Sequence, residues 1–395
     1  MSTIFTPADI LLPDGVRDTY ERFAVIACDQ FTSEPDYWRE AEAARDGAFS
    51  ALDLILPEVY LGTPEERERN AKIRETMQTA AERLQNHPDS FVYLERTLPD
   101  GSVRRGLVGK IDLSAYDYSP SSASPVRPTE ATVTSRIPPR VAIRREATVE
   151  LPHVMLLMDD PENAVLEAAA RNADEPLYDF PLMLGGGHAR GYHLAGQAAK
   201  DTLAAVAAYE ASRTGVVYAV GDGNHSLASA AAYYREQGAA DGPARYALVE
   251  LVNLHDPALE FEPIYRLLKH CDPGDALVSL AVAGEGSGVT VPAVTAAGEV
   301  MVPQPCTHAL TVGSLQEWID AYVAAHPGTE CDYIHGEEAL RTLAAEPDQV
   351  GFLCSGIEKE DLFPYVSRYG PLPRKTFSMG EAKSKRYYIE ARKIR

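Results

Sequence analysis

The chain has 395 residues, of which 45% are hydrophobic and 24% charged, the shares of an ordinary globular protein. Its 58 acidic and 37 basic side chains give a net charge of −21, which disfavours nucleic acid and anionic membranes as partners. We find no apolar stretch long enough to span a membrane and no secretory signal, so we expect a cytoplasmic protein of two or three domains. Five separated cysteines without a C-x-x-C pair indicate free thiols.

The first third of the chain alternates apolar runs with helix signals. Its predicted elements are a buried strand at 23–28, helices at 33–48 and 63–84, and a strand pair at 91–95 and 104–112. The first strand ends in the polar pair Asp29 and Gln30, a position where ligand sites are common. A Ser- and Pro-rich stretch at 116–128 predicts a linker or mobile loop.

The rest of the chain continues this alternation, although the pattern weakens between residues 255 and 303. Its predicted strands lie at 151–158, 178–184, 215–220, 245–254 and 350–354, and its predicted helices at 161–172, 194–212, 226–237 and 314–325. Such alternation predicts an α/β to α+β fold, with a mixed β-sheet core, flanking helices and a second subdomain. We divide the chain into an N-terminal region 1–125, a central region 126–260 and a C-terminal region 261–395.

The most informative segment is GDGNHS at 221–226, which joins a β-branched strand directly to a helix. Gly221 and Gly223 allow a tight turn, and the free amides of the first helical turn favour an anion, with phosphate the usual occupant. Asp222 is a candidate ligand for a metal ion, and His225 and Ser226 are candidate donors to phosphate oxygens. The alternative interpretation is a tight turn with Asn224 or Ser226 as the helix cap.

Two further segments contain candidate residues. LGGGHARGY at 184–192 predicts a flexible loop over a ligand, with His188 in it; His188 and His193 match the helical zinc pair poorly. RPTE at 127–130 places Arg127, Thr129 and Glu130 at a strand entry, where a carboxylate beside an arginine suits a general base or a metal ligand. A surface salt bridge is the alternative for this second segment.

The segment 371–395 is basic, with eight Lys and Arg and two acidic residues, a net 8 − 2 = +6 in an acidic chain. Arg374 and Lys375 stand there beside hydroxyl side chains, a combination that suits recognition of an oxyanion. A solvated basic tail remains the alternative.

Long motifs in order along the chain resemble a known bacterial family, domain-of-unknown-function family 1015 (DUF1015). They include IACDQFTSEPDYW, GKIDLSAYDY, RPTEATVTSRIPPR, LPHVMLLMDDPE, YDFPLMLGGGH, GDGNHSLASA, RYALVELVNLHDPALEFEPIYR and PRKTFSMGEAKSKRYYIEARKI. The family name itself implies no activity.

GDGNHSLASA is also similar, more remotely, to the helix-start motif of the ParB/sulfiredoxin-like superfamily, in which this turn holds nucleotide phosphates. Free-serine kinases belong to that superfamily, so the resemblance implies a kinase-type phosphotransferase that uses ATP or ADP with Mg²⁺, with free L-serine as one acceptor. Ser226 stands where the superfamily usually has Arg, and Arg374 and Lys375 are our candidates to supply that contact.

The resemblance implies roles for residues 222–226, and together with the other candidates of the sequence they form three groups. The expected catalytic residues are Glu130, Asp222 and His225. The expected nucleotide-binding residues are Gly221, Gly223, Asn224, Ser226, Arg127, Thr129, His188, Arg374 and Lys375. Asp222 is also the expected metal ligand.

Two other functions stay open beside the phosphotransferase. One is a non-catalytic module that binds a nucleotide and changes conformation or partner, and the other is a metal-dependent hydrolase built on His188, His193 and Asp222. The expected partner is a small-molecule substrate, and the sequence does not decide between a monomer and a homodimer.

Overall fold

The computed structural model describes residues 3–15 and 17–395 and divides the chain into two compact units. The first unit comprises residues 1–259 together with 381–395, and the second comprises 260–380. The predicted regions 1–125 and 126–260 therefore fall within one unit, and residues 381–395 return to it after the second unit. The Ser- and Pro-rich stretch is no linker between units, because Tyr116 and Val126 within it are buried in the first unit's core.

The first unit is built on a ten-stranded sheet of order β6-β11-β8-β12-β5-β4-β10-β9, with β1 and β2 added on β5 and β4. Its strands are β1 Phe5–Thr6, β2 Ala8–Pro13, β4 Leu84–Thr97, β5 Val103–Asp112, β6 Val126–Pro128, β8 Met155–Met158, β9 Pro176–Pro181, β10 His188–Leu194, β11 Tyr218–Asp222 and β12 Tyr246–Asn253. The pairs β11·β6 and β12·β8 are parallel and the others antiparallel. The predicted mixed sheet is thus confirmed.

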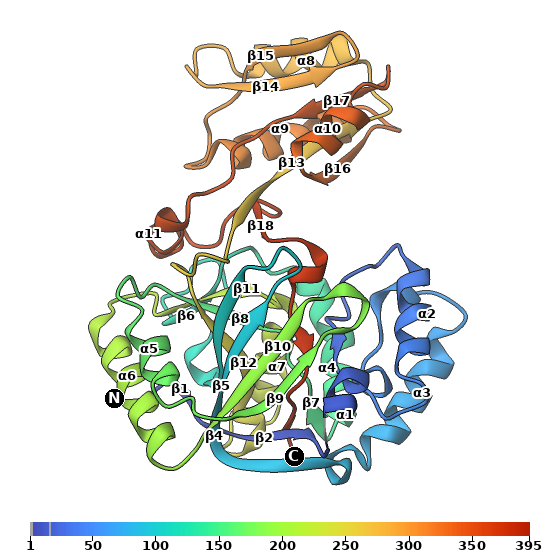
Figure 1. Ribbon diagram of the computed structural model, residues 1–395. Coiled ribbons are helices and arrows are strands. Elements are labelled where there is room, and N and C mark those ends of the chain that lie inside the picture. The colour runs from blue at the N-terminus through green and yellow to red at the C-terminus, as the bar shows by residue number, and fades with distance from the viewer. Residues whose placement is uncertain (1–2, 16) are drawn as a thin grey trace. The chain divides into compact units, whose positions relative to one another are not determined.

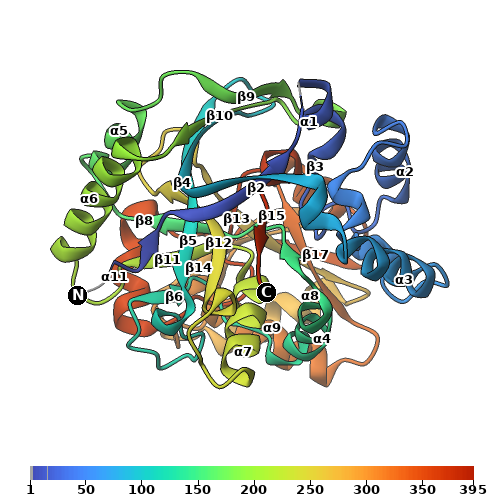
Figure 2. The same cartoon turned by 90° about the horizontal axis from the view of Figure 1, so that it is seen from below.

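Seven helices accompany this sheet in the described part of the first unit. They are α1 Arg17–Phe23, α2 Pro35–Ala44, α3 Glu66–Met77, α4 Ile137–Glu146, α5 Ala164–Ala170, α6 Gln197–Ser212 and α7 Asn224–Glu236. Figures 1 and 2 show α5 and α6 on one side of the long strands and α2 and α3 on the other. The flanking helices of the expected fold are therefore present on both sides.

Both faces of the sheet are buried, because successive residues of a strand point to opposite faces. On β4, Val92 and Leu94 enter one apolar cluster, whereas Phe91 and Tyr93 enter the other. Two short ladders attach the C-terminal segment to the unit: β19 Tyr387–Tyr388 pairs with β3 Val25–Ile26, and β20 Arg392–Lys393 pairs with β7 Val149–Glu150. This pairing brings residues near 28 beside residues near 388.

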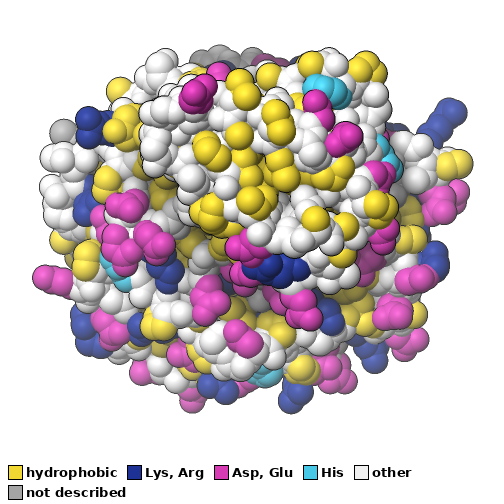
Figure 3. All heavy atoms as spheres, turned by 90° about the horizontal axis from the view of Figure 1, so that it is seen from above, with side chains coloured by type: hydrophobic (Ala, Val, Ile, Leu, Met, Phe, Trp, Pro, Cys, Tyr) yellow, Lys and Arg dark blue, Asp and Glu magenta, His cyan; other side chains and the backbone are white. Residues whose placement is uncertain are grey.

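The second unit is smaller, combines helices with a β-sheet and has its own apolar core. Its sheet has the order β15-β14-β17-β13-β16, with β18 paired to β13. Its elements are β13 Phe261–Lys269, α8 Pro273–Ala283, β14 Thr290–Thr295, β15 Gly298–Pro303, α9 Thr311–Ala325, β16 Glu330–His335, α10 Glu337–Leu343, β17 Gln349–Phe352, α11 Lys359–Tyr369 and β18 Phe377–Met379. Hydrophobic side chains are exposed on this unit, among them Val278 and Val282 of α8 (Figure 3).

Two further sequence expectations in these units were wrong. The flexible loop expected at 184–192 is largely strand β10, which pairs with both β4 and β9. The helix expected at 63–84 ends at Met77, and β4 begins at Leu84. No helix of the described residues is long and apolar enough to cross a membrane.

Candidate functional site

The GDGNHS segment forms the predicted turn between β11 and α7. Gly223 stands at the turn with φ +75°, and a Cβ there would lie 2.9 Å from the Val154 Cα, so only glycine fits. Helix α7 begins at Asn224, and no side chain caps its N-terminus. Asp222, His225 and Ser226 are half-buried, so a small ligand can reach the turn. Its free amides and the helix dipole favour an anion at this position.

Asn224 holds a neighbouring loop rather than capping the helix. Its Nδ2 donates to the Glu130 carbonyl and to the Thr132 Oγ1, both at 3.0 Å, and its Oδ1 accepts from the Tyr116 hydroxyl. The side chain of Asn224 is therefore occupied by the loop, and its backbone amide is the group that can meet a ligand.

The RPTE segment lies beside this turn, but its members differ in accessibility. Arg127 lies on β6, is buried and donates from Nε to the Ser124 carbonyl at 2.7 Å. Thr129 is buried as well, and its hydroxyl donates to the Val220 carbonyl at 2.8 Å. Thr129 thus anchors the loop to β11, and Arg127 bonds within its own segment. Glu130 is half-buried, which leaves it the better placed of the three to reach a ligand.

The His225 imidazole is neutral and its tautomer is set by a backbone contact. Burial and the charges of Arg136 and Arg140 lower the pKa of His225 to about 4. Its Nε2 accepts from the Val133 amide at 3.2 Å, so the proton resides on Nδ1. His225 can donate to a phosphate oxygen from Nδ1 but not from Nε2.

We predict that the His225 ring stays neutral from pH 8 to pH 5 and titrates near pH 4 in NMR spectra of the folded protein. The pKa in the folded state is depressed below the ordinary value of 6.5, so the unfolded chain takes up the proton first on acidification. The contribution of His225 to stability therefore falls as the pH drops from 6.5 to about 4. A His225 resonance that titrates between pH 6 and 7 would contradict the assignment.

Charged side chains from distant segments lie at and near Asp222. The Lys385 Nζ lies 3.8 Å from the Asp222 Oδ2, and the Gly223 amide donates to the Asp222 Oδ1 at 2.8 Å. The Asp29 carboxylate lies close enough to His225 to influence the pKa of that ring, and Lys385 lies close enough to influence the pKa of Asp29. The carboxylate of Asp29 is 3.8 Å from the His153 Nε2. These groups form what we call the turn site: Asp222, the α7 N-terminus, Asp29, His153 and Lys385.

Asp29 is anionic in this setting. Burial alone would raise its pKa, but the neighbouring His153, the Gln30 amide and Lys385 outweigh that effect and lower the pKa of Asp29. The His153 ring is oriented in turn, because its Nδ1 lies 2.9 Å from the Tyr388 hydroxyl. The turn site therefore combines two carboxylates, a lysine and a helix N-terminus.

The sequence had not placed Asp29, His153 or Lys385 among the site residues. The sequence does point to Asp29, because an apolar run ends there in polar residues. Lys385 lies in the basic segment 371–395. His153 is an isolated histidine in LPHVMLL and carried no signal. The β3·β19 pairing, which brings residues near 28 and 388 together, could not be read from local patterns.

A metal ion at this site would have few protein ligands. The described ranges contain no group of three or more His, Cys, Asp and Glu side chains that could hold a metal. Mg²⁺ commonly binds through one or two carboxylates together with waters and substrate phosphates, a mode that Asp222 and Asp29 suit. His188 instead pairs with Asp179 at 3.0 Å, and His193 packs against His87. Neither contact brings these histidines to Asp222, so the hydrolase interpretation gains no support.

Arg374 and Lys375 belong to the second unit and are exposed there. The Arg374 Nη2 donates to the Asp320 Oδ1 at 2.9 Å, and the Arg374 carbonyl accepts from the Arg266 Nη2 at 3.2 Å. Within the first unit, the cations around the turn are Lys385, Arg136 and Arg140, and Arg140 already pairs with Glu58.

The chain belongs to the family described as protein of unknown function (DUF1015), whose model matches residues 12–302. No curated protein matches the chain. Among solved structures it is similar to a mutant free serine kinase in complex with ADP, at 12% identity and a TM-score of 0.42, over 74% of this chain and 93% of that one.

Two other solved structures resemble the chain at a similar level. One is a conserved hypothetical protein from Pyrococcus furiosus, with 12% identity, a TM-score of 0.37, and coverage of 72% of this chain and 94% of that one. The other is truncated SbnI from Staphylococcus aureus, with 7% identity, a TM-score of 0.38, and coverage of 69% and 82%. At these TM-scores the likeness carries no argument about activity.

Proposed function

We propose that the turn site binds the phosphates of a nucleotide and transfers the terminal phosphoryl group to a small hydroxylated metabolite, with free L-serine as the specific candidate. The observation that carries the proposal is an uncapped helix N-terminus, reachable from solvent, beside a lysine and two carboxylates. Phosphoryl transfer depends on positioning and on neutralising charge more than on covalent chemistry, and these groups supply both.

Each group has a role in this proposal. The α7 amides and the Nδ1 of His225 bind phosphate oxygens, and Lys385 neutralises negative charge on the phosphates. Asp222 would hold Mg²⁺, which would neutralise further charge on those oxygens. The acceptor oxygen attacks the terminal phosphorus as the bond from phosphorus to the leaving nucleotide oxygen breaks. Asp29, which is anionic, is our first candidate to take the proton of the acceptor hydroxyl, and Glu130 is the alternative.

Replacing Lys385 with methionine is expected to weaken nucleotide binding by about 10-fold to 100-fold, because a charge-assisted hydrogen bond is worth about 1.5–3 kcal/mol. Isothermal titration of the purified full chain with ATP, ADP and CTP, each with Mg²⁺, measures the effect. Lys393→Met is the matched control, since Lys393 is an exposed lysine of the same segment. No binding by the wild-type protein, or equal binding by Lys385→Met, would rule the proposal out.

A non-catalytic nucleotide-binding module is the second candidate. The carboxylates Asp222 and Asp29 already face Lys385 and His153, so they could serve to hold cations in place rather than to react. Mass spectrometry of amino acids and sugars incubated with the nucleotide, Mg²⁺ and the protein separates the two functions. Phosphoserine or another phosphorylated product supports the phosphotransferase, and binding without any product supports the module.

A further inference from the structure

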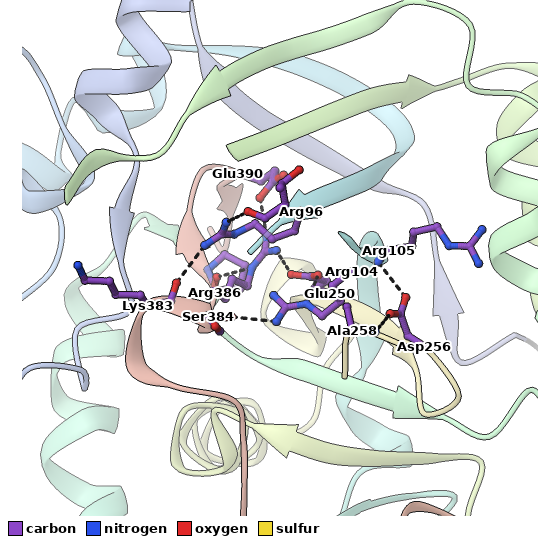
Figure 4. Close-up of polar contacts among 12 residues, drawn as sticks. Arg96, Arg104, Arg105, Glu250, Asp256, Ala258, Lys383, Ser384, Arg386 and Glu390 are labelled. Atoms are coloured by element: carbon purple, nitrogen blue, oxygen red, sulfur yellow. Dashed lines mark hydrogen bonds and ion pairs between the residues drawn. The ribbon is translucent and has the colours of Figure 1, made fainter. Parts of the chain in front are cut away.

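A buried cluster of charged side chains lies on one face of the large sheet, under the C-terminal segment (Figure 4). Arg96 of β4 and Arg104 of β5 stand directly opposite each other in the antiparallel register, and Glu250 of β12 lies beside them. Arg386 pairs with both Glu250 and Glu390. Arg96, Arg104 and Arg386 are each 2% exposed, and the two glutamates are fully buried. Three buried cations thus face two buried anions.

This arrangement is unfavourable for stability alone. Like charges directly opposite in a ladder destabilise a sheet, and apolar side chains often replace buried ion pairs without loss. Burial and the charge of Arg104 lower the pKa of Arg96 to about 9. Within the described chain, the Nε and Nη2 of Arg104, the Nε of Arg96 and the Oε1 of Glu250 have no hydrogen-bond partner. Packing and stability therefore do not explain why these charged side chains are buried.

Each of the two arginines makes one contact with the segment that leads into the turn site, and the Nη1 of Arg96 also donates to the Thr97 carbonyl at 2.7 Å. The Arg96 Nη2 donates to the Lys383 carbonyl at 3.1 Å, and the Arg104 Nη1 donates to the Ser384 carbonyl at 2.9 Å. The next residue is Lys385, whose ammonium reaches Asp222. Arg386 then anchors the following position through the Pro152 carbonyl at 3.1 Å. The carbonyl groups of the two residues before Lys385 and the side chain of the residue after it are thus all fixed by hydrogen bonds.

We propose that Arg96 and Arg104 are positioning residues, which hold Lys385 against Asp222 through the carbonyls of Lys383 and Ser384. The contacts themselves support the positioning of Lys385. The effect of that positioning on ligand affinity rests on the proposed function. A lysine has about four rotatable bonds and orders at an entropic cost, so fixing its backbone in advance strengthens its contact with a bound anion.

The adjacent residue of β5 provides a matched control. Arg105 points to the opposite face, where its Nη1 pairs with Glu167 at 2.9 Å and is partly exposed. Arg104→Met, Arg104→Lys and Arg105→Met would be compared in the full chain. Acetylation of Lys385 by an amine-reactive ester, followed by mass spectrometry with the exposed Lys393 as internal reference, reports on the placement of Lys385 without any nucleotide.

We expect Lys385, whose side chain is 13% exposed, to be acetylated at least threefold faster in Arg104→Met. Arg104→Lys should fall between it and the wild type, and Arg105→Met should match the wild type. An unchanged rate in folded Arg104→Met overturns the proposal. If Arg104→Met does not fold, the acetylation rate of Lys385 in Arg104→Lys decides in the same way. The lysine side chain is shorter and lacks a planar guanidinium, so it cannot reproduce the contact with the Ser384 carbonyl.

A double-mutant cycle tests the second step. If Arg104 acts through Lys385, nucleotide binding by Arg104→Met/Lys385→Met should equal that of Lys385→Met alone, since the single losses are then not additive. If the fold-losses in nucleotide affinity of the two single variants multiply in the double variant, Arg104 acts independently of Lys385, and the proposal is overturned. If the wild-type protein binds no nucleotide, the proposed function fails, and the acetylation rates still decide whether Arg104 positions Lys385.

Discussion

The variant Arg386→Met is expected to lose about 3–5 kcal/mol of stability in the first unit at pH 7, because it leaves buried glutamates without their cation. Arg386 is 2% exposed and pairs with Glu250 and Glu390, both fully buried. Trp38 lies in the core of the first unit and Trp318 in that of the second, so Trp38 fluorescence in a Trp318→Phe background reports the relevant unfolding transition. Denaturant unfolding in that background measures the loss.

The pH dependence of this loss has a definite sign. Burial would raise the pKa of Glu250, but Arg386 and Arg104 outweigh it and lower that pKa. In the wild type the stabilisation is present above the ordinary carboxyl pKa of 4.5 and is lost as the pH falls through the lowered value. Without Arg386, a buried carboxylate would instead take up a proton at higher pH in the folded state. The deficit of Arg386→Met should therefore be smaller at pH 5 than at pH 7.

Two further variants test the cause of the loss. Arg386→Met/Glu390→Gln should recover part of the stability, since it removes one of the charges left unpaired. Arg395→Met, an exposed arginine of the same segment, should unfold at the wild-type denaturant concentration. A deficit below about 1 kcal/mol in Arg386→Met at pH 7 would show that the cluster is solvated or otherwise compensated.

The second large effect is expected from Ser226→Glu, in the first turn of α7. A carboxylate there places negative charge where the proposed phosphates bind, and like-charge contacts in an interface cost several kcal/mol. Nucleotide affinity should fall by about 100-fold or more. The same carboxylate interacts favourably with the helix dipole, so the thermal midpoint should stay equal or rise. Loss of binding without loss of stability distinguishes a ligand site from a structural turn.

The matched control is Gln197→Glu, which adds the same charge to the exposed first turn of α6. It should leave nucleotide affinity within about twofold of the wild type, because screening confines the effect of an exposed charge to about 10 Å. Titration calorimetry and thermal unfolding of both variants give the comparison. Undiminished nucleotide affinity in Ser226→Glu would show that the α7 N-terminus is not part of the binding site.

Local signals predicted much of the fold correctly. The β11–α7 turn follows from Gly223 and the short polar segment around it, and the Ala-rich stretch and the β4–β5 pair appear as helix α6 and as strands. Strand β10 was missed because the three glycines just before it, at 185–187, and Gly191 within it suggest a loop. In the fold, a Cβ at Gly191 would lie 2.2 Å from the Tyr178 ring, so glycine there permits packing that only the tertiary structure reveals.

The turn site was only partly predictable for a related reason. Gly223, Asp222 and His225 are neighbours in sequence, whereas Asp29, His153 and Lys385 come from three separate segments. The elements between 255 and 303 were also missed. Strand β15 among them is an edge strand with mostly exposed side chains, so it lacks the alternation that marks a half-buried strand.

The order of segments along the chain has a consequence for synthesis on the ribosome. Residues 381–395 complete the first unit but are translated after the whole of the second. Until they emerge, the nascent chain contains Arg96, Arg104 and Glu250 without Arg386, and it is also without Lys385 of the turn site. A product that stops after the second unit would therefore lack both the cation that pairs with the buried glutamates and Lys385 of the turn site, and we expect its first unit to fold poorly.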